Sequence, residues 1–137
     1  MKKMILFIED DYLYNYASKR TVQEFDKDIE VLIALNGNQA LNMLCRLEVE
    51  SKLFPFLIFM DFDLPKMGYD FMQRLSRFNF YGKYVNKVIG MTSSDQSFPA
   101  HQYGNSRLGS PRYIAKPLSD ETLLGLLKAD LELVTHE

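Results

Sequence analysis

The chain has 137 residues, of which 47% are hydrophobic and 25% are charged, and its formal net charge at pH 7 is -2. This composition predicts one globular domain and excludes a disordered chain, and the lack of excess positive charge argues against direct nucleic-acid binding. Cys45 is the only cysteine, and the apolar run after Met1-Lys2-Lys3 is too short for a signal peptide or a membrane span. We therefore expect a cytoplasmic protein without membrane contact.

Five short apolar runs are the predicted strands of the fold. Their residues are apolar without alternation, which is typical of strands that are covered on both faces in a parallel sheet. The runs lie at residues 4–8, 31–34, 56–60, 88–91 and 113–115.

The segments between these runs carry apolar residues three and four positions apart, the spacing of one helix face. The first helix should start near Asp11, whose charge suits the first turn, and its apolar positions are Leu13, Tyr16, Ala17 and Phe25. The second should follow a turn at residues 36–38 that can supply a cap. Its apolar positions are Ala40, Leu41, Leu44, Cys45 and Leu47.

The second half of the chain continues the alternation of strands and helices. A third helix is predicted from Gly68 to about Phe78, and a short or irregular fourth helix within the Pro- and Gly-containing span 93–111. The last helix should begin after Ser119 as N-cap and bury Leu123, Leu124, Leu127, Leu131 and Val134. Together these elements predict an α/β fold with a doubly wound parallel sheet and helices on both faces.

Polar residues follow four of the predicted strands at their carboxyl ends, where ligands bind in doubly wound sheets. They are Glu9 and Asp10, Asp61, Thr92 and Lys116. Carboxylates this close would repel one another by about 4 kcal/mol per pair, which favours a hard cation such as Mg²⁺ among them. Asp61 could then act as a nucleophile toward phosphorus, with Lys116 neutralising the phosphoryl oxygens and Thr92 donating a hydrogen bond.

Four stretches of the chain resemble the receiver domain of two-component response regulators, and the resemblance covers nearly the whole length. The first is Ile-Leu-Phe-Ile-Glu-Asp-Asp at 5–11, and the second is Phe-Leu-Ile-Phe-Met-Asp-Phe-Asp-Leu-Pro-Lys-Met-Gly at 56–68. The others are Gly-Met-Thr-Ser at 90–93 and Gly-Ser-Pro-Arg-Tyr-Ile-Ala-Lys-Pro at 109–117. Each stretch alone is weakly specific, but the four in this order are strongly so.

The resemblance implies a flavodoxin-like strand order 2-1-3-4-5 and a phosphoryl group accepted on Asp61. Glu9, Asp10, Asp61 and the backbone carbonyl of Asp63 would hold Mg²⁺, and Lys116 would assist the transfer. The donor would be a sensor histidine kinase or a phosphotransfer protein.

The resemblance also implies a signalling role rather than that of an enzyme. Thr92 and Tyr113 would be the switch residues, and Lys116-Pro117 would share the family's cis peptide bond. We expect residues 1–137 to form a single receiver domain without an output domain, so that the signal leaves through a downstream protein partner.

Three alternatives stay open on the sequence alone. A haloacid-dehalogenase-type phosphohydrolase also has an Asp-x-Asp after a strand, as at Asp61-Phe62-Asp63, but its acidic pair comes last and not first. A topoisomerase-primase-type metal domain would leave Thr92 and Lys116-Pro117 unexplained. A pseudo-receiver that docks partners without phosphorylation would not need the complete set of acidic, hydroxyl and lysine side chains.

Overall fold

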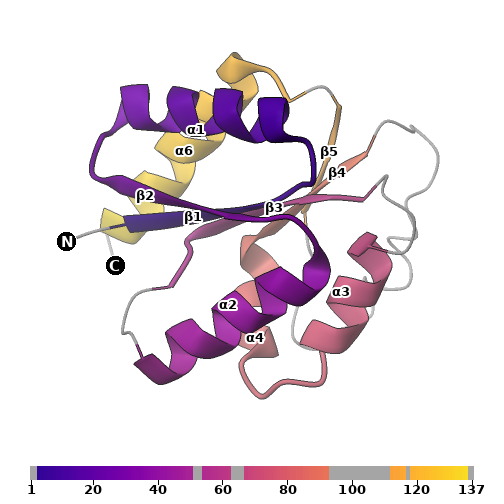
Figure 1. Cartoon of the computed structure of the whole chain (residues 1–137). Coiled ribbons are helices and arrows are strands. Elements are labelled where there is room, and N and C mark those ends of the chain that lie inside the picture. The colour runs from indigo at the N-terminus through magenta and orange to yellow at the C-terminus, as the bar shows by residue number, and fades with distance from the viewer. Residues whose placement is uncertain (1–2, 51–53, 63–66, 93–111, 117, 136–137) are drawn as a thin grey trace.

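The computed structural model describes residues 3–50, 54–62, 67–92, 112–116 and 118–135, and within this part the strands form one parallel sheet (Figure 1). The strands are β1 (Lys3–Ile8), β2 (Ile29–Ala34), β3 (Leu57–Asp61), β4 (Val88–Thr92) and β5 (Arg112–Ala115). Their order is β2-β1-β3-β4-β5. The predicted strands and the flavodoxin-like fold class are therefore confirmed.

Helices cover both faces of this sheet. Figure 1 shows α1 (Tyr12–Phe25) and α6 (Asp120–Thr135) on one face, and α2 (Gly37–Glu50), α3 (Met67–Leu75) and α4 (Tyr81–Tyr84) on the other. A 3₁₀ turn, η1 (Val85–Lys87), joins α4 to β4. Within the described residues, no helix is both long enough and apolar enough to cross a membrane.

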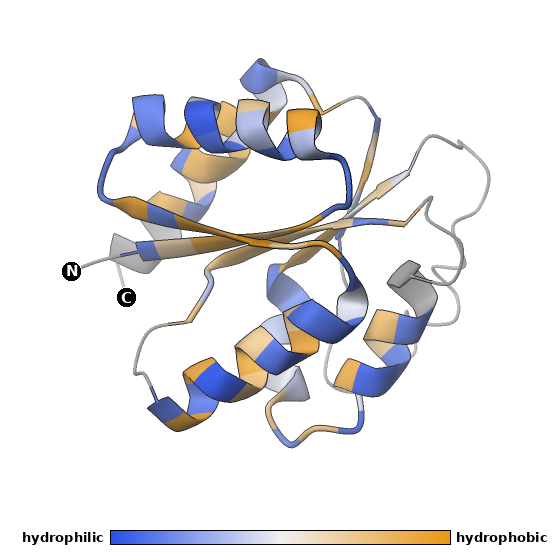
Figure 2. Cartoon of the chain, in the orientation of Figure 1, coloured by the Kyte–Doolittle hydropathy of each residue, from blue (hydrophilic) through white to orange (hydrophobic). Residues whose placement is uncertain are grey.

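Each face of the sheet has its own hydrophobic core. The α1-side core contains Ile5 and Phe7 of β1, and the ring of Phe7 stacks on Phe59 of β3 at 5.0 Å. The α2-side core contains the alternate β1 residues Leu6 and Ile8. Because successive strand residues point to opposite faces, both sets must be apolar, which explains the continuous apolar runs (Figure 2).

The orientation of α1 differs from the prediction. Leu13 and Tyr16 are 81% and 67% exposed, whereas the buried residues of this helix are Asn15, Ser18 and Val22. The start of the helix is as expected, because the Asp11 side chain accepts hydrogen bonds from the first-turn amides. The predicted apolar face was therefore wrong at Leu13, Tyr16 and Ala17, which are exposed, whereas Phe25 is partly buried against the core as predicted. The polar Asn15, which has a hydrogen-bond partner, points inward instead.

Two other helices begin at the predicted caps. The Asn36 side chain accepts a hydrogen bond from the Gln39 amide at 2.9 Å, and the Gln39 side chain accepts one from the Leu35 amide at 2.8 Å. At the start of α6, the Ser119 hydroxyl accepts a bond from the Thr122 amide at 3.1 Å. The core positions of α2 agree with the prediction, since Ala40, Leu41 and Leu44 are buried. In α6 the predicted positions Leu123 and Leu127 are buried, and Leu124 and Leu131 are partly buried.

The region after α3 was only partly predicted. The helix ends at Leu75, and the Phe78 amide bonds back to the Leu75 carbonyl in a turn. The ring of Phe78 then stacks on Phe80 at 4.8 Å. The short helix α4 and η1 were missed because four- and three-residue elements carry no full period of apolar spacing. The predicted helix within 93–111 lies outside the described residues.

Candidate functional site

Backbone hydrogen bonds extend the sheet just beyond the carboxyl ends of the strands. The Glu9 amide donates to the Ala34 carbonyl at 3.0 Å, and the Phe62 amide donates to the Met91 carbonyl at 2.9 Å. The Lys116 amide donates to the Thr92 carbonyl at 2.8 Å. Residues that are distant in the sequence are therefore held at one edge of the sheet.

Asp61 and Lys116 form an ion pair at this edge. Lys116 Nζ lies 2.8 Å from Asp61 Oδ1, and the Asp61 side chain is only 4% exposed. A buried carboxylate is costly without such a partner, because it has lost its hydration. The fourth and fifth strands of the sheet thus bring a cation to the end of the third.

Glu9 lies in contact with this pair. Burial, a hydrogen bond with the Asp61 carboxyl and the charge of Asp61 raise the pKa of Glu9 to about 8, and Lys116 opposes these effects. One carboxyl oxygen, Oε2, is buried and has no hydrogen-bond partner among the described residues. The cluster therefore holds two adjacent carboxyl groups beside one lysine, and a further positive charge would stabilise both carboxylates in their ionised form.

The donor set of this edge suits a hard cation such as Mg²⁺. Glu9 and Asp61 supply carboxylate oxygens, which Mg²⁺ prefers, and the buried Oε2 of Glu9 is a free acceptor in the described part of the chain. Asp10 is exposed, and its charge also raises the pKa of Glu9. Among the described residues no three acidic, His or Cys side chains form a closed metal-binding group. The fourth predicted ligand, Asp63, lies outside the described residues.

Replacing Glu9 with glutamine should make stability less dependent on pH. Folding raises the pKa of Glu9 from 4.5 to about 8, so its contribution is full below 4.5 and is lost as the pH rises through 8. Without added metal, the free energy of unfolding of Glu9→Gln should rise relative to that of the parent by on the order of 1 kcal/mol or more on going from about pH 5 to pH 9. Urea unfolding at the two pH values measures this, and a difference that does not change with pH would contradict it.

The two predicted switch residues lie on neighbouring strands. Thr92 ends β4 and is paired in register with Ala115, and Tyr113 of β5 is paired with Gly90. Both Thr92 and Tyr113 are half-buried. The Tyr113 ring lies 5.8 Å from the ring of Phe62, the residue that follows Asp61. Pro117, and with it the predicted cis peptide bond, lies outside the described residues.

Sequence reasoning missed several residues next to this site. Asn15 of α1 is 2% exposed and donates from Nδ2 to the Glu9 carbonyl at 2.8 Å. Tyr14 donates its hydroxyl to Met91 Sδ at 3.1 Å, and burial raises its pKa to about 12. Neither residue gave a signal in the sequence, because the partner of each lies in another chain segment.

The comparisons with known proteins agree with this fold. A solved two-component response regulator from Legionella pneumophila is 28% identical, with a TM-score of 0.76 over 96% of this chain and 99% of its own. One from Cytophaga hutchinsonii is 22% identical (TM-score 0.75, 96% and 99%), and a chemotaxis response regulator of Vibrio cholerae is 21% identical (TM-score 0.69, 95% and 99%). No curated protein matches the chain. The family pattern described as response regulator receiver domain matches residues 5–128, so the chain belongs to the receiver domains of response regulators.

Proposed function

We propose that this receiver domain accepts a phosphoryl group on Asp61 from a phosphohistidine of a sensor histidine kinase or phosphotransfer protein. The observation that carries the proposal is the ion pair between Asp61 and Lys116 beside the Glu9 carboxyl. Family membership leaves a non-phosphorylated pseudo-receiver as the remaining alternative. That alternative gives no chemical role to a buried carboxylate pair with a lysine across it.

In the proposed transfer, an Asp61 carboxylate oxygen attacks phosphorus, and the bond between phosphorus and the donor imidazole nitrogen breaks. The leaving nitrogen keeps the bonding electron pair, and Asp61 becomes an acyl phosphate. Lys116 is close enough to Asp61 to neutralise charge on the phosphoryl oxygens. Mg²⁺ bound by Glu9, Asp10, Asp61 and the Asp63 carbonyl would add positive charge at the same oxygens.

The proposed output begins at Thr92. Phosphoryl oxygens on Asp61 are strong acceptors, so the Thr92 hydroxyl is expected to donate to them. Movement of Thr92 changes the space behind β4, and Tyr113 on the adjacent strand repacks in response. A downstream protein partner would read the resulting surface. In this proposal the chain is one cytoplasmic signalling domain and not an enzyme.

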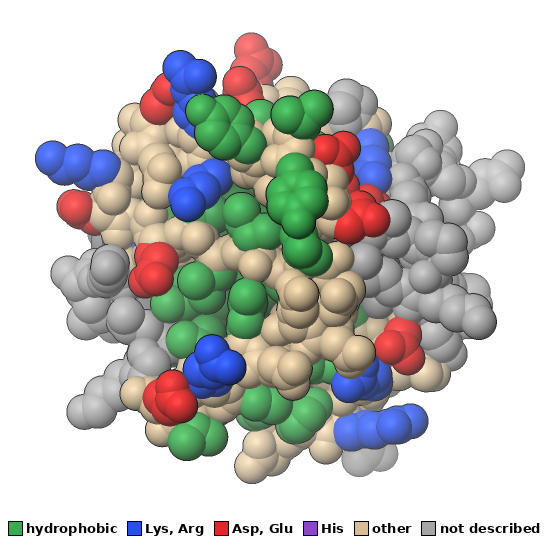
Figure 3. Space-filling view, viewed as in Figure 1, with side chains coloured by type: hydrophobic (Ala, Val, Ile, Leu, Met, Phe, Trp, Pro, Cys, Tyr) green, Lys and Arg blue, Asp and Glu red, His purple; other side chains and the backbone are tan. Residues whose placement is uncertain are grey.

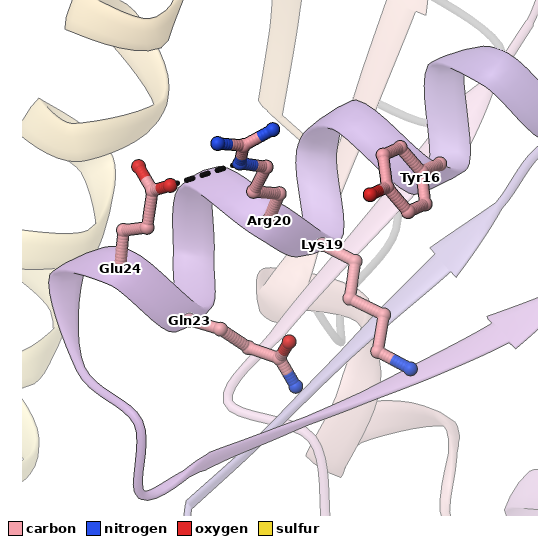
Figure 4. Close-up of a pocket in the computed structure, with 5 residues that line it drawn as sticks. All are labelled: Tyr16, Lys19, Arg20, Gln23 and Glu24. Atoms are coloured by element: carbon pink, nitrogen blue, oxygen red, sulfur yellow. Dashed lines mark hydrogen bonds and ion pairs between the residues drawn. The ribbon is translucent and has the colours of Figure 1, made fainter.

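The outer surface of α1 supports docking of a protein donor. Tyr12, Leu13 and Tyr16 are 74%, 81% and 67% exposed, although residues of this size usually contribute to a core. Figure 3 shows hydrophobic side chains gathered over α1, with acidic side chains beside them. Next to these exposed side chains is a surface pocket lined by Tyr16, Lys19, Arg20, Gln23 and Glu24 (Figure 4). Within it, Arg20 and Glu24 form an ion pair. A helix of the donor with apolar and charged positions would suit this surface.

Intact-mass measurement after treatment with acetyl phosphate and Mg²⁺ tests the proposal. The parent should gain the mass of one phosphoryl group, and Asp61→Asn should gain none, because an amide oxygen is a poor nucleophile. Asp70→Asn, at an exposed residue of α3, is a matched control and should be phosphorylated like the parent. An unmodified parent would favour the pseudo-receiver, and a phosphate on serine, threonine or histidine would overturn the assignment of Asp61.

A further inference from the structure

Asn15 is an unusual residue for the inward face of an amphipathic helix. It is 2% exposed, while the larger and more apolar Leu13 and Tyr16 of the same helix point to solvent. Its Nδ2 donates to the Glu9 carbonyl at 2.8 Å, but its Oδ1 is buried without a hydrogen-bond partner among the described residues. Since an unpaired buried amide oxygen costs about 1–3 kcal/mol, stability alone does not explain this residue.

The hydrogen bond from Asn15 fixes one particular peptide group. The Glu9 amide is held by the Ala34 carbonyl, and the Glu9 carbonyl is held by Asn15, so the peptide between Glu9 and Asp10 has a set orientation. The next residue, Asp11, is held by its bonds to the first turn of α1. Asp10 is thus carried on a backbone that is fixed on both sides, although its own side chain is exposed.

We propose that Asn15 is a positioning residue that holds the acidic pair, Glu9 and Asp10, in the geometry that binds Mg²⁺. The inference rests on the proposed function, because it assigns these carboxylates to the metal. Asn15 touches neither a phosphoryl group nor the metal in this proposal, and it acts through the Glu9 carbonyl. Replacing a residue that orients metal ligands in this way typically lowers metal affinity about 10- to 100-fold.

The test is Asn15→Leu, which keeps the branching of the side chain at Cγ and removes both the donor and the unpaired oxygen. Its thermal stability should stay close to that of the parent, because removal of the unpaired Oδ1 offsets the loss of the hydrogen bond to the Glu9 carbonyl. Its Kd for Mg²⁺ alone, from isothermal titration calorimetry, should rise about 10-fold or more. In the metal-free protein, the Asp10 amide should exchange its hydrogen faster, as followed by NMR. A merely structural role would predict the opposite pattern, with lower stability and unchanged affinity.

Ser18→Ala is the matched control, because Ser18 is the other buried polar residue of α1 and lies one turn further on. It should bind Mg²⁺ like the parent. An unchanged Kd in a folded Asn15→Leu protein would overturn the role of Asn15 and leave the proposed function standing. A parent that binds no Mg²⁺ would overturn both. If Asn15→Leu does not fold, Asn15→Ala is titrated with Mg²⁺ instead. A Kd raised about 10-fold or more supports the role of Asn15, and an unchanged Kd overturns it.

Discussion

Replacing Lys116 with alanine is expected to slow phosphorylation by acetyl phosphate about 100-fold or more while the protein stays folded. Lys116 Nζ lies 2.8 Å from Asp61 Oδ1, so its charge is already at the position where the phosphoryl oxygens arrive. The side chain is 28% exposed and forms little of either core, which is why the fold should survive. Intact-mass time courses at saturating Mg²⁺, with circular dichroism of each variant, measure both effects.

Two further variants separate charge from packing. Lys116→Met keeps the aliphatic part of the side chain and loses the ammonium group, so it should be as slow as Lys116→Ala. Lys128→Ala removes an exposed lysine of α6 and should leave the rate unchanged. Phosphorylation of Lys116→Met at the parental rate would show that the charge is not needed. An unfolded Lys116→Ala protein would instead show that the ion pair with Asp61 is needed for the fold.

Adding a single methyl group at Gly90 should destabilise the domain by about 1–3 kcal/mol. A Cβ at this position would lie 1.8 and 2.1 Å from two ring carbons of Phe62, and 3.0 Å from Tyr113 Cδ1. The Phe62 ring cannot keep its place, so it must move away from position 90. Urea unfolding of Gly90→Ala measures the cost. Gly125→Ala is the matched control, because nothing lies within 4 Å of the added carbon and alanine favours the helix.

A double-mutant cycle assigns the cost of Gly90→Ala to Phe62. Phe62→Ala alone should lose the contact with Tyr113, but it also removes the atoms that the new methyl group would meet. The loss of unfolding free energy in the double variant should therefore be smaller than the sum of the two single losses by about 0.5–3 kcal/mol. Additive effects would mean that the backbone of β4, and not the Phe62 ring, limits the residue at position 90.

The strands and the edge of the sheet at which the site residues gather were predictable from the sequence, because both depend on short-range patterns. Continuous apolar runs identify strands buried on both faces, and the residue after each run is carried to the same edge. Glu9, Asp61 and Lys116 do meet there. The same reasoning does not give distances between side chains, so it could not separate the buried Glu9 from the exposed Asp10.

The face of α1 could not be predicted from hydrophobicity alone. The apolar spacing favours Leu13 and Tyr16, but the bond from Asn15 to the Glu9 carbonyl rotates the helix toward a polar position. That bond joins a side chain to a backbone atom in another element, and no local pattern encodes it. The contact of Phe62 with Tyr113 over Gly90 has the same character, since it joins residues of three chain segments.

The alternation along β4 provides two independent spectroscopic reporters. Gly90 faces the α2-side core beneath Phe62 and Tyr113, whereas its neighbour Met91 belongs to the α1-side core and accepts the Tyr14 hydroxyl. Met91 is also paired in register with Asp61. A labelled Met91 methyl group and a labelled Tyr113 ring therefore report on different cores, so that one NMR sample distinguishes events on the α1 side of the sheet from events on the α2 side.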